Sequence, residues 1–139
     1  MFILDTNILS ALMRNNPDVR IMNWLDKQAA ESIWTTSVTI FEVNYGLEIL
    51  PEGKKKKSLK ALFKNVCEKD LHNRIFDFDS LSAQEAARIS AELKNMGKPV
   101  DFRDVQIAGI TSARKGILVT CNTKHFINCG IDIIDPSIS

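Results

Sequence analysis

Short apolar segments alternate along this chain with longer segments in which apolar residues recur at helical spacing. The short segments are rich in β-forming residues and predict strands at residues 2–5, 32–37, 74–79, 117–120 and 131–135. The longer segments predict six helices. The first begins near Asn7, the second covers about 18–30, and the third follows a cap at Ser37. The fourth runs from Gly53 to about His72, the fifth ends at Gly97, and the sixth spans about 102–115 after a cap at Asp101. This alternation is typical of a parallel α/β sheet covered by helices on both faces.

Composition places the chain among ordinary globular proteins. Its 139 residues contain no internal repeat or low-complexity linker, so we expect a single domain over residues 1–139. Lys and Arg number 18 against 17 Asp and Glu, and the resulting net charge of +1 indicates no partner. No apolar run approaches the roughly 20 residues of a membrane span, and no basic leader precedes one, so we expect a cytoplasmic protein without membrane association.

The cysteines do not indicate a metal or disulfide framework. Cys67, Cys121 and Cys129 are odd in number, widely spaced and never arranged as a CxxC pair. A zinc site and a disulfide scaffold are therefore both unsupported, and free thiols are typical of a reducing cytosol.

Four oxygen-bearing side chains stand near predicted strand ends or helix starts. Asp5 ends the first strand, Glu42 lies one turn into the third helix, Asp104 lies in the first turn of the last helix, and Asn122 follows the fourth strand. Functional groups of parallel sheets gather at the carboxyl ends of the strands, and right-handed crossovers would bring these residues to one rim. Such hard ligands suit Mg²⁺ or Mn²⁺, which can orient a phosphate and activate water.

Each of the four residues also has an ordinary structural explanation. Asp5 is a common helix-cap type, Glu42 is compatible with an exposed helix face, Asp104 complements a helix dipole, and Asn122 is a common turn residue. Their ordered combination is what favours a functional site. No Gly-rich phosphate loop occurs, and a Ser/His/Asp set is not indicated because the only histidines are His72 and His125.

Several motifs together resemble one family. The segments are "LDTNILSAL", "TTSVTIFEVNYGLEILPEGKKKKSL", "DVQIAGI", "ILVTCNTKHF" and "IDIIDP", and they cover nearly the whole chain in order. They are similar to PIN-domain ribonuclease toxins of the VapC/FitB group, which belong to prokaryotic toxin–antitoxin systems. The resemblance implies a Rossmann-like three-layer α/β/α sandwich with a short, mainly parallel sheet and an acidic pocket for Mg²⁺, with Mn²⁺ as a substitute.

The resemblance also assigns residues. Asp5, Glu42 and Asp104 match the family's three acids, so they are the expected catalytic residues and metal ligands. Asn122 stands where many members have a fourth acid; it is expected to be a weak or water-mediated ligand, which leaves open whether one or two metals bind. Thr6 matches the family's hydroxyl beside the first acid and is expected to hydrogen-bond within the pocket.

The implied activity is metal-dependent hydrolysis of RNA phosphodiester bonds, with tRNA favoured among the substrates. A water activated by the metal is the expected nucleophile, because no histidine is expected in a general-base position. Arg103 and Lys124 are expected to contact the RNA backbone. His125 is compatible with base stacking, whereas Phe126 is expected to anchor the core. The run "GKKKKSLKALFK" fits either a solvated helix face or phosphate contacts.

The resemblance further implies a cognate antitoxin and a homodimer or larger assembly. The helices carrying Trp24, Phe41 and Tyr45 present apolar residues for such contacts. One alternative is a catalytically weak or inactive PIN domain that serves as a protein- or RNA-binding module. A haloacid-dehalogenase-like phosphatase is disfavoured because Asn7 stands where its second Asp is required, and a receiver-like domain because its paired acids and late-strand Lys are not evident.

Overall fold

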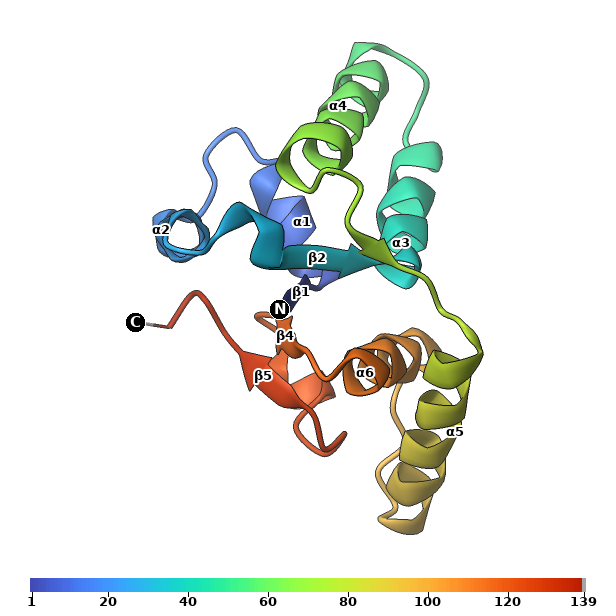
Figure 1. Ribbon diagram of the computed structural model, residues 1–139. Helices are drawn as coiled ribbons and strands as arrows, with labels where there is room; N and C mark the ends of the chain where they lie inside the picture. Colours follow the sequence, from blue (N-terminus) through green and yellow to red (C-terminus); the bar gives the residue numbers. More distant parts are fainter. Residues whose placement is uncertain (139) are drawn as a thin grey trace.

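The computed structural model describes residues 1–138, which form a five-stranded sheet (Figure 1). Its strands lie in the order β3-β2-β1-β4-β5, and every neighbouring pair is parallel. The sheet is therefore wholly parallel over these strands rather than mainly so. The strands are β1 (Phe2–Leu4), β2 (Ile33–Thr36), β3 (Ile75–Phe76), β4 (Ile117–Val119) and β5 (Asp132–Ile134).

Six helices cover the two faces of this sheet. Figure 1 shows the first four on one side and the last two on the other, which confirms the predicted α/β/α sandwich. The helices are α1 (Thr6–Leu12), α2 (Val19–Asp26), α3 (Ser37–Glu48), α4 (Lys54–Asn65), α5 (Ser80–Asn95) and α6 (Phe102–Arg114). Short 3₁₀ helices occupy Ala30–Ser32 and Thr123–His125, and a π-helical segment, Val66–Asp70, continues α4. No helix of the described chain is long and apolar enough to cross a membrane.

The alternation of side chains along β1 divides the core into two clusters. Ile3 packs into the cluster under α5 and α6, whereas Leu4 packs into the one under the helices of the other face. Both side chains are almost wholly buried, because consecutive residues of a strand point to opposite faces of the sheet. Phe126 is fully buried in the first cluster, as expected.

Two helix starts differ from the prediction. The first helix begins at Thr6 with Asp5 as its N-cap, rather than near Asn7. Thr36, not Ser37, caps α3 and accepts a hydrogen bond from the Thr39 N–H at 3.0 Å. Asp5 and Thr36 both have the extended backbone and the side-chain oxygen that an N-cap needs.

Several other bounds also differ. The helix expected over 18–30 ends at Asp26, the helix expected to reach His72 becomes π-helical after Asn65, and β3 has only two of the six residues expected.

The strand order places one crevice at the centre of the sheet. β1 and β4 are neighbours, but the chain leaves β1 toward β2 and leaves β4 toward β5. In parallel sheets such a reversal opens a crevice beyond the carboxyl ends of the two strands. Asp5 stands at this point, and its N–H donates to the Val119 carbonyl at 3.0 Å.

Candidate active site

Asp5 is a buried carboxylate held by three donors. Only 5% of the residue is exposed. One oxygen, Oδ1, accepts from the Thr6 N–H at 2.8 Å; the other, Oδ2, accepts from the Thr120 hydroxyl at 2.8 Å and from Asn7 Nδ2 at 3.1 Å. Burial raises the pKa of Asp5 above its usual value, and these hydrogen bonds oppose that rise. The carboxylate is thus fixed in direction and keeps acceptor capacity to spare.

Thr120 and Asn7 join the loops that follow β1 and β4. The Thr120 hydroxyl, fully buried, accepts from the Asn122 N–H at 3.0 Å and from Asn7 Nδ2 at 3.1 Å. Asn7 Oδ1 accepts from the Cys121 N–H at 3.0 Å. Sequence analysis missed both positioning residues. Their only signal was that a small polar residue stands just beyond each of two apolar strands.

Thr6 connects the first acid to the second. Its hydroxyl donates to Glu42 Oε1 at 2.9 Å, and its N–H is one of the donors to Asp5. The other Glu42 oxygen, Oε2, lies 3.6 Å from Arg103 Nη1. Glu42 is half-buried, so the helix face that carries it turns toward the crevice rather than to open solvent.

Asp104 lies in the first turn of α6 and contacts a histidine. His125 Nδ1 is 3.2 Å from Asp104 Oδ2. Partial burial raises the pKa of Asp104 to about 6, and the carboxylates of Asp5, Asp101 and Glu42 add to the rise while His125 opposes it. The 3₁₀ helix after β4 thus brings His125 beside this acid, a contact that was not predicted from the sequence.

The remaining predicted residues lie at the edge of the site. Asn122 is exposed, and within residues 1–138 its side chain makes no hydrogen bond. Lys124 is exposed and forms no ion pair in that same part of the chain. Arg103 reaches Glu42 and also Asp101, whose Oδ1 is 3.4 Å from Arg103 Nε. Asp101 caps α6, as expected.

We call Asp5, Glu42 and Asp104 the acidic rim. Over the described chain no three His, Cys, Asp or Glu residues are close enough to hold a metal ion by themselves. Mg²⁺ commonly takes only one or two carboxylates and keeps several waters. Thr6 bonds to both Asp5 and Glu42, and the charges of these two acids raise the pKa of Asp104. The donor set is therefore compatible with a hydrated divalent cation.

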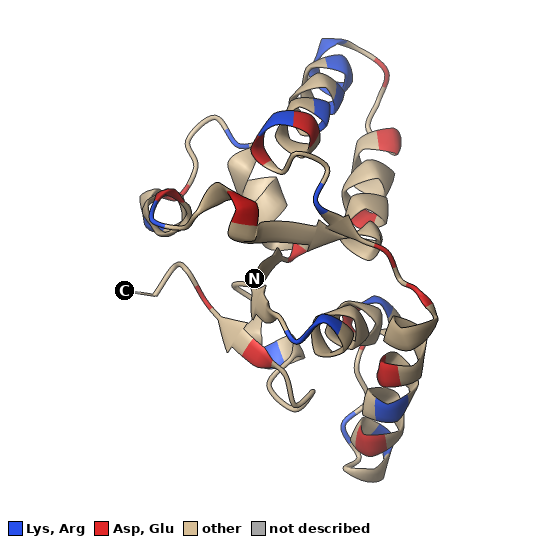
Figure 2. Ribbon diagram, in the orientation of Figure 1, with Lys and Arg blue, Asp and Glu red and all other residues tan. Residues whose placement is uncertain are grey.

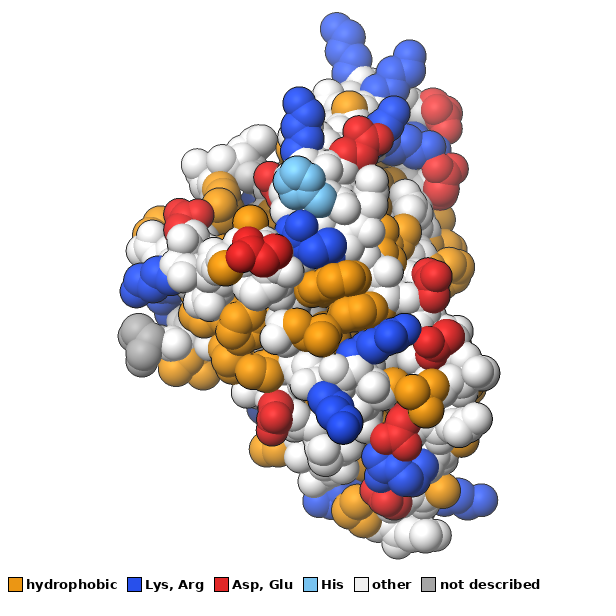
Figure 3. All heavy atoms as spheres, in the orientation of Figure 1, with side chains coloured by type: hydrophobic (Ala, Val, Ile, Leu, Met, Phe, Trp, Pro, Cys, Tyr) orange, Lys and Arg blue, Asp and Glu red, His pale blue; other side chains and the backbone are white. Residues whose placement is uncertain are grey.

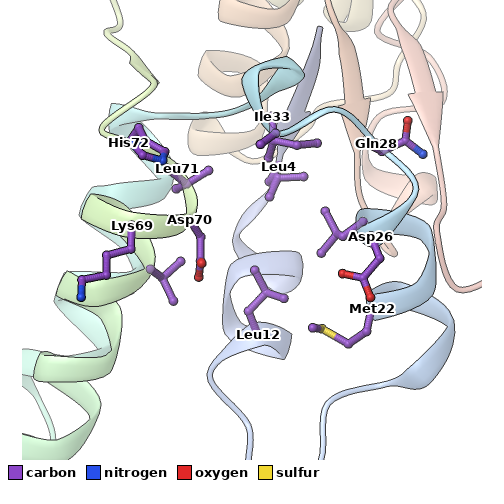
Figure 4. Close-up of a pocket in the computed structure, with 13 residues that line it drawn as sticks. Leu4, Leu12, Met22, Asp26, Gln28, Ile33, Lys69, Asp70, Leu71 and His72 are labelled. Atoms are coloured by element: carbon purple, nitrogen blue, oxygen red, sulfur yellow. The ribbon is translucent and has the colours of Figure 1, made fainter.

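A separate cavity lies away from the acidic rim (Figure 4). Its volume is about 410 Å³. Leu12 and Met22 lie across it from Leu71 and His72 (Figure 4). None of its lining residues belongs to the acidic rim.

Comparison with known proteins gives one consistent family. The PIN domain profile matches residues 2–129. A VapC ribonuclease of Sinorhizobium fredii is 31% identical over 98% of this chain and 97% of its own. The tRNA(fMet)-specific endonuclease VapC of Shigella flexneri is 34% identical over 93% of this chain and 92% of its own. The crystal structure of FitAcB from Neisseria gonorrhoeae matches with a TM-score of 0.92 and 28% identity over 100% of both chains.

Proposed function

Because this chain belongs to the PIN domain family, we propose that it is a metal-dependent endoribonuclease and the toxin of a toxin–antitoxin pair. The observation that carries the proposal is the buried carboxylate of Asp5 at the crevice between β1 and β4, linked to Glu42 through Thr6. The printed names of the relatives from Sinorhizobium and Shigella, a ribonuclease and an endonuclease, support the same activity.

The acidic rim would hold Mg²⁺, or Mn²⁺ in its place. Asp5 and Asp104 would hold the ion directly, Glu42 would position it through water, and Asn122 is the candidate for a weak or water-mediated contact. A bound ion supplies positive charge to the phosphodiester oxygens and activates the attacking water. The donor bonds from Thr6, Asn7 and Thr120 keep Asp5 aimed into the crevice.

Other side chains of the site have supporting roles. The charge of His125, whose Nδ1 lies 3.2 Å from Asp104 Oδ2, favours the ionised form of Asp104. Arg103 lies beside Glu42 and its side chain is exposed, so its guanidinium can contact a phosphate. Lys124, exposed on the 3₁₀ helix that carries His125, is the second proposed contact to the RNA backbone.

We favour tRNA among the RNA substrates. The support is the relative from Shigella flexneri, which is named for its action on tRNA(fMet) and is 34% identical to this chain. A catalytically weak PIN domain that only binds RNA or protein is the alternative, and metal-dependent cleavage distinguishes the two.

The proposed partners are a cognate antitoxin and a second copy of the chain, in the cytoplasm. The apolar cavity between α1, α2 and the π-helical segment is our candidate site for an antitoxin segment. Phe41 and Tyr45, 60% and 55% exposed on one face of α3, are the candidate dimer contacts. Trp24 is half-buried and forms an edge-to-face pair with Phe2.

The test is cleavage of a tRNA and rRNA mixture by partner-free protein, with Mg²⁺ and with EDTA. Wild type is compared with Asp5→Asn, which keeps an acceptor for the Thr6 N–H and so keeps the helix cap. Asp132→Asn, at an exposed acid that begins β5, is the matched control. We expect discrete fragments from wild type and Asp132→Asn only when Mg²⁺ is present, and none from Asp5→Asn.

Two results would contradict the proposal. Folded wild type that cleaves no RNA with any divalent metal would favour the binding-module alternative. Fragments that persist in Asp5→Asn would assign the cleavage to another site or to a contaminant.

A further inference from the structure

A second groove leads away from the acidic rim between α1 and α3. Its volume is about 330 Å³. Thr6 and Glu42 line one end of it, and Arg14, after α1, and Leu59, on α4, line it as well. We call this space the α1–α3 groove. It therefore shares two residues with the proposed active site and lies along α1, which also contributes Ser10.

Small residues keep this groove open, and aliphatic ones form its wall. A Cβ atom placed on Gly46 would meet no atom within 4 Å, so α3 leaves free space at this position. Val43 and Leu47, buried on the same helix, give the groove an apolar wall. Ser10, across from them on α1, adds a hydroxyl. An apolar wall with one polar group is the kind of surface that holds the flat face of a nucleobase.

Positive charge gathers beyond the groove. Arg14 is exposed and forms no ion pair within residues 1–138. Lys55 lies one turn before Leu59 on α4, so it stands beside Leu59 on the same helix face. Lys54, Lys55 and Lys57 are exposed and unpaired in the described chain. Figure 2 shows Lys and Arg positions in blue along α4, and Figure 3 shows basic side chains at the top of the same view.

We propose that the α1–α3 groove is a subsite for one nucleotide of single-stranded RNA, next to the nucleotide at the acidic rim. Its base lies against Val43 and Leu47, and Arg14 contacts the following phosphate. This inference rests on the proposed ribonuclease function. RNA fits better than a protein segment, because a metal-binding rim at one end and unpaired cations at the other both attract phosphates.

The test fills the groove at Gly46. Gly46→Leu places a side chain in the free space, and Gly46→Ala is the matched control because its methyl group meets nothing. Binding of a fluorescein-labelled ten-nucleotide RNA is measured by anisotropy without divalent metal, so that no cleavage occurs. We expect about tenfold weaker binding for Gly46→Leu, the loss typical of one base contact, and wild-type binding for Gly46→Ala. Competition by linear polyphosphate, which has no bases, should be equal in all three proteins.

A second pair of variants tests the phosphate contact. Arg14→Gln should reduce the slope of log affinity against log salt by about 0.7, the value for one phosphate on a single strand. Arg20→Gln is the control, because Arg20 is exposed but paired with Asp18 at 3.0 Å. In wild type, RNA carrying 4-thiouridine should crosslink to residues 43–47 of α3.

The outcomes separate the subsite from the nuclease proposal. Weakened RNA binding by Gly46→Leu supports the subsite even if wild type cleaves nothing with any metal. Unchanged binding and an unchanged KM for cleavage by Gly46→Leu would overturn the subsite while leaving the nuclease intact. Crosslinks confined to other helices would overturn it too, and would leave the groove to a protein partner.

Discussion

At the scale of single residues, the site depends on keeping a buried carboxylate ionised and aimed. Burial raises the pKa of Asp5, and the Thr120 hydroxyl is the largest influence against that rise. That hydroxyl also accepts from the Asn122 N–H and from Asn7. The Thr120 side chain thus links the ends of β1 and β4 around Asp5. Replacing Thr120 therefore tests the hydrogen-bond network without removing the carboxylate.

Thr120→Val keeps the shape of this residue and removes its hydrogen bonds. We expect the free energy of unfolding to fall by about 1–3 kcal/mol, because a buried carboxylate loses a donor, and metal-dependent cleavage to fall at least about tenfold. Urea denaturation and initial rates measure the two effects. Thr111→Val is the control, because that hydroxyl is equally buried but donates only to the Ile107 carbonyl within α6. Equal losses in the two variants would show that Thr120 has no special part in the site.

At the scale of elements, the position of Asp104 depends on how closely α6 approaches α5. Gly109 makes that approach possible. A Cβ atom at this residue would lie 2.5 Å from the Ser82 carbonyl oxygen and 2.7 Å from the Ala86 Cβ. Both distances are shorter than real Cβ contacts, so the glycine is required by packing between the two helices rather than by its backbone angles.

Gly109→Ala should therefore push α6 away from α5. We expect a loss of about 1–3 kcal/mol in stability, typical of an overpacked core, and weaker cleavage because Asp104 moves with its helix. Gly46→Ala provides the opposite case: it is a helix glycine with free space around it, and should gain about 0.5–1 kcal/mol. Thermal unfolding of both variants checks the prediction. A neutral Gly109→Ala would mean that the helices separate at no cost.

At the scale of the whole molecule, gathering three acids on one rim makes stability depend on pH. The pKa of Asp104 is raised to about 6, and that of Asp5 is raised as well. The folded protein therefore binds more protons than the unfolded chain between about pH 4 and 6. Stability falls as the pH rises through this window and stays lower above it. Crowding these acids therefore costs stability in the absence of a cation.

Asp104→Asn should remove much of this dependence in metal-free protein. At pH 7.5 we expect the variant to be more stable than wild type by roughly 1–3 kcal/mol, and at pH 5 the difference should shrink. Denaturation in EDTA at both pH values measures it. The gain is reduced by whatever the contact between Asp104 and His125 contributes in wild type, because that contact is lost in the variant. The control is Asp101→Asn, since the pKa of Asp101 is lowered by the Arg103 N–H. An Asp104→Asn protein no more stable than wild type at pH 7.5 would contradict the argument.

Local signals in the sequence determined the order of strands and helices and the candidates for the acidic rim. Helical spacing, two-residue alternation and capping residues act over a few positions, so they can be read along the chain. Asp5, Glu42 and Asp104 were found this way, each by its place beside a strand end or a helix start. The first strand was also evident, because an apolar segment leads directly into Asp5.

Only the tertiary structure decided which of these residues meet. Thr120 donates to Asp5 across 115 residues of chain, because β4 lies beside β1 in the sheet. The contact of His125 with Asp104 and the groove between α1 and α3 likewise depend on how helices pack over that strand order. Such contacts arise from crossovers between distant segments and leave no periodic trace in the sequence, whereas each element's own type is set by its nearest neighbours along the chain.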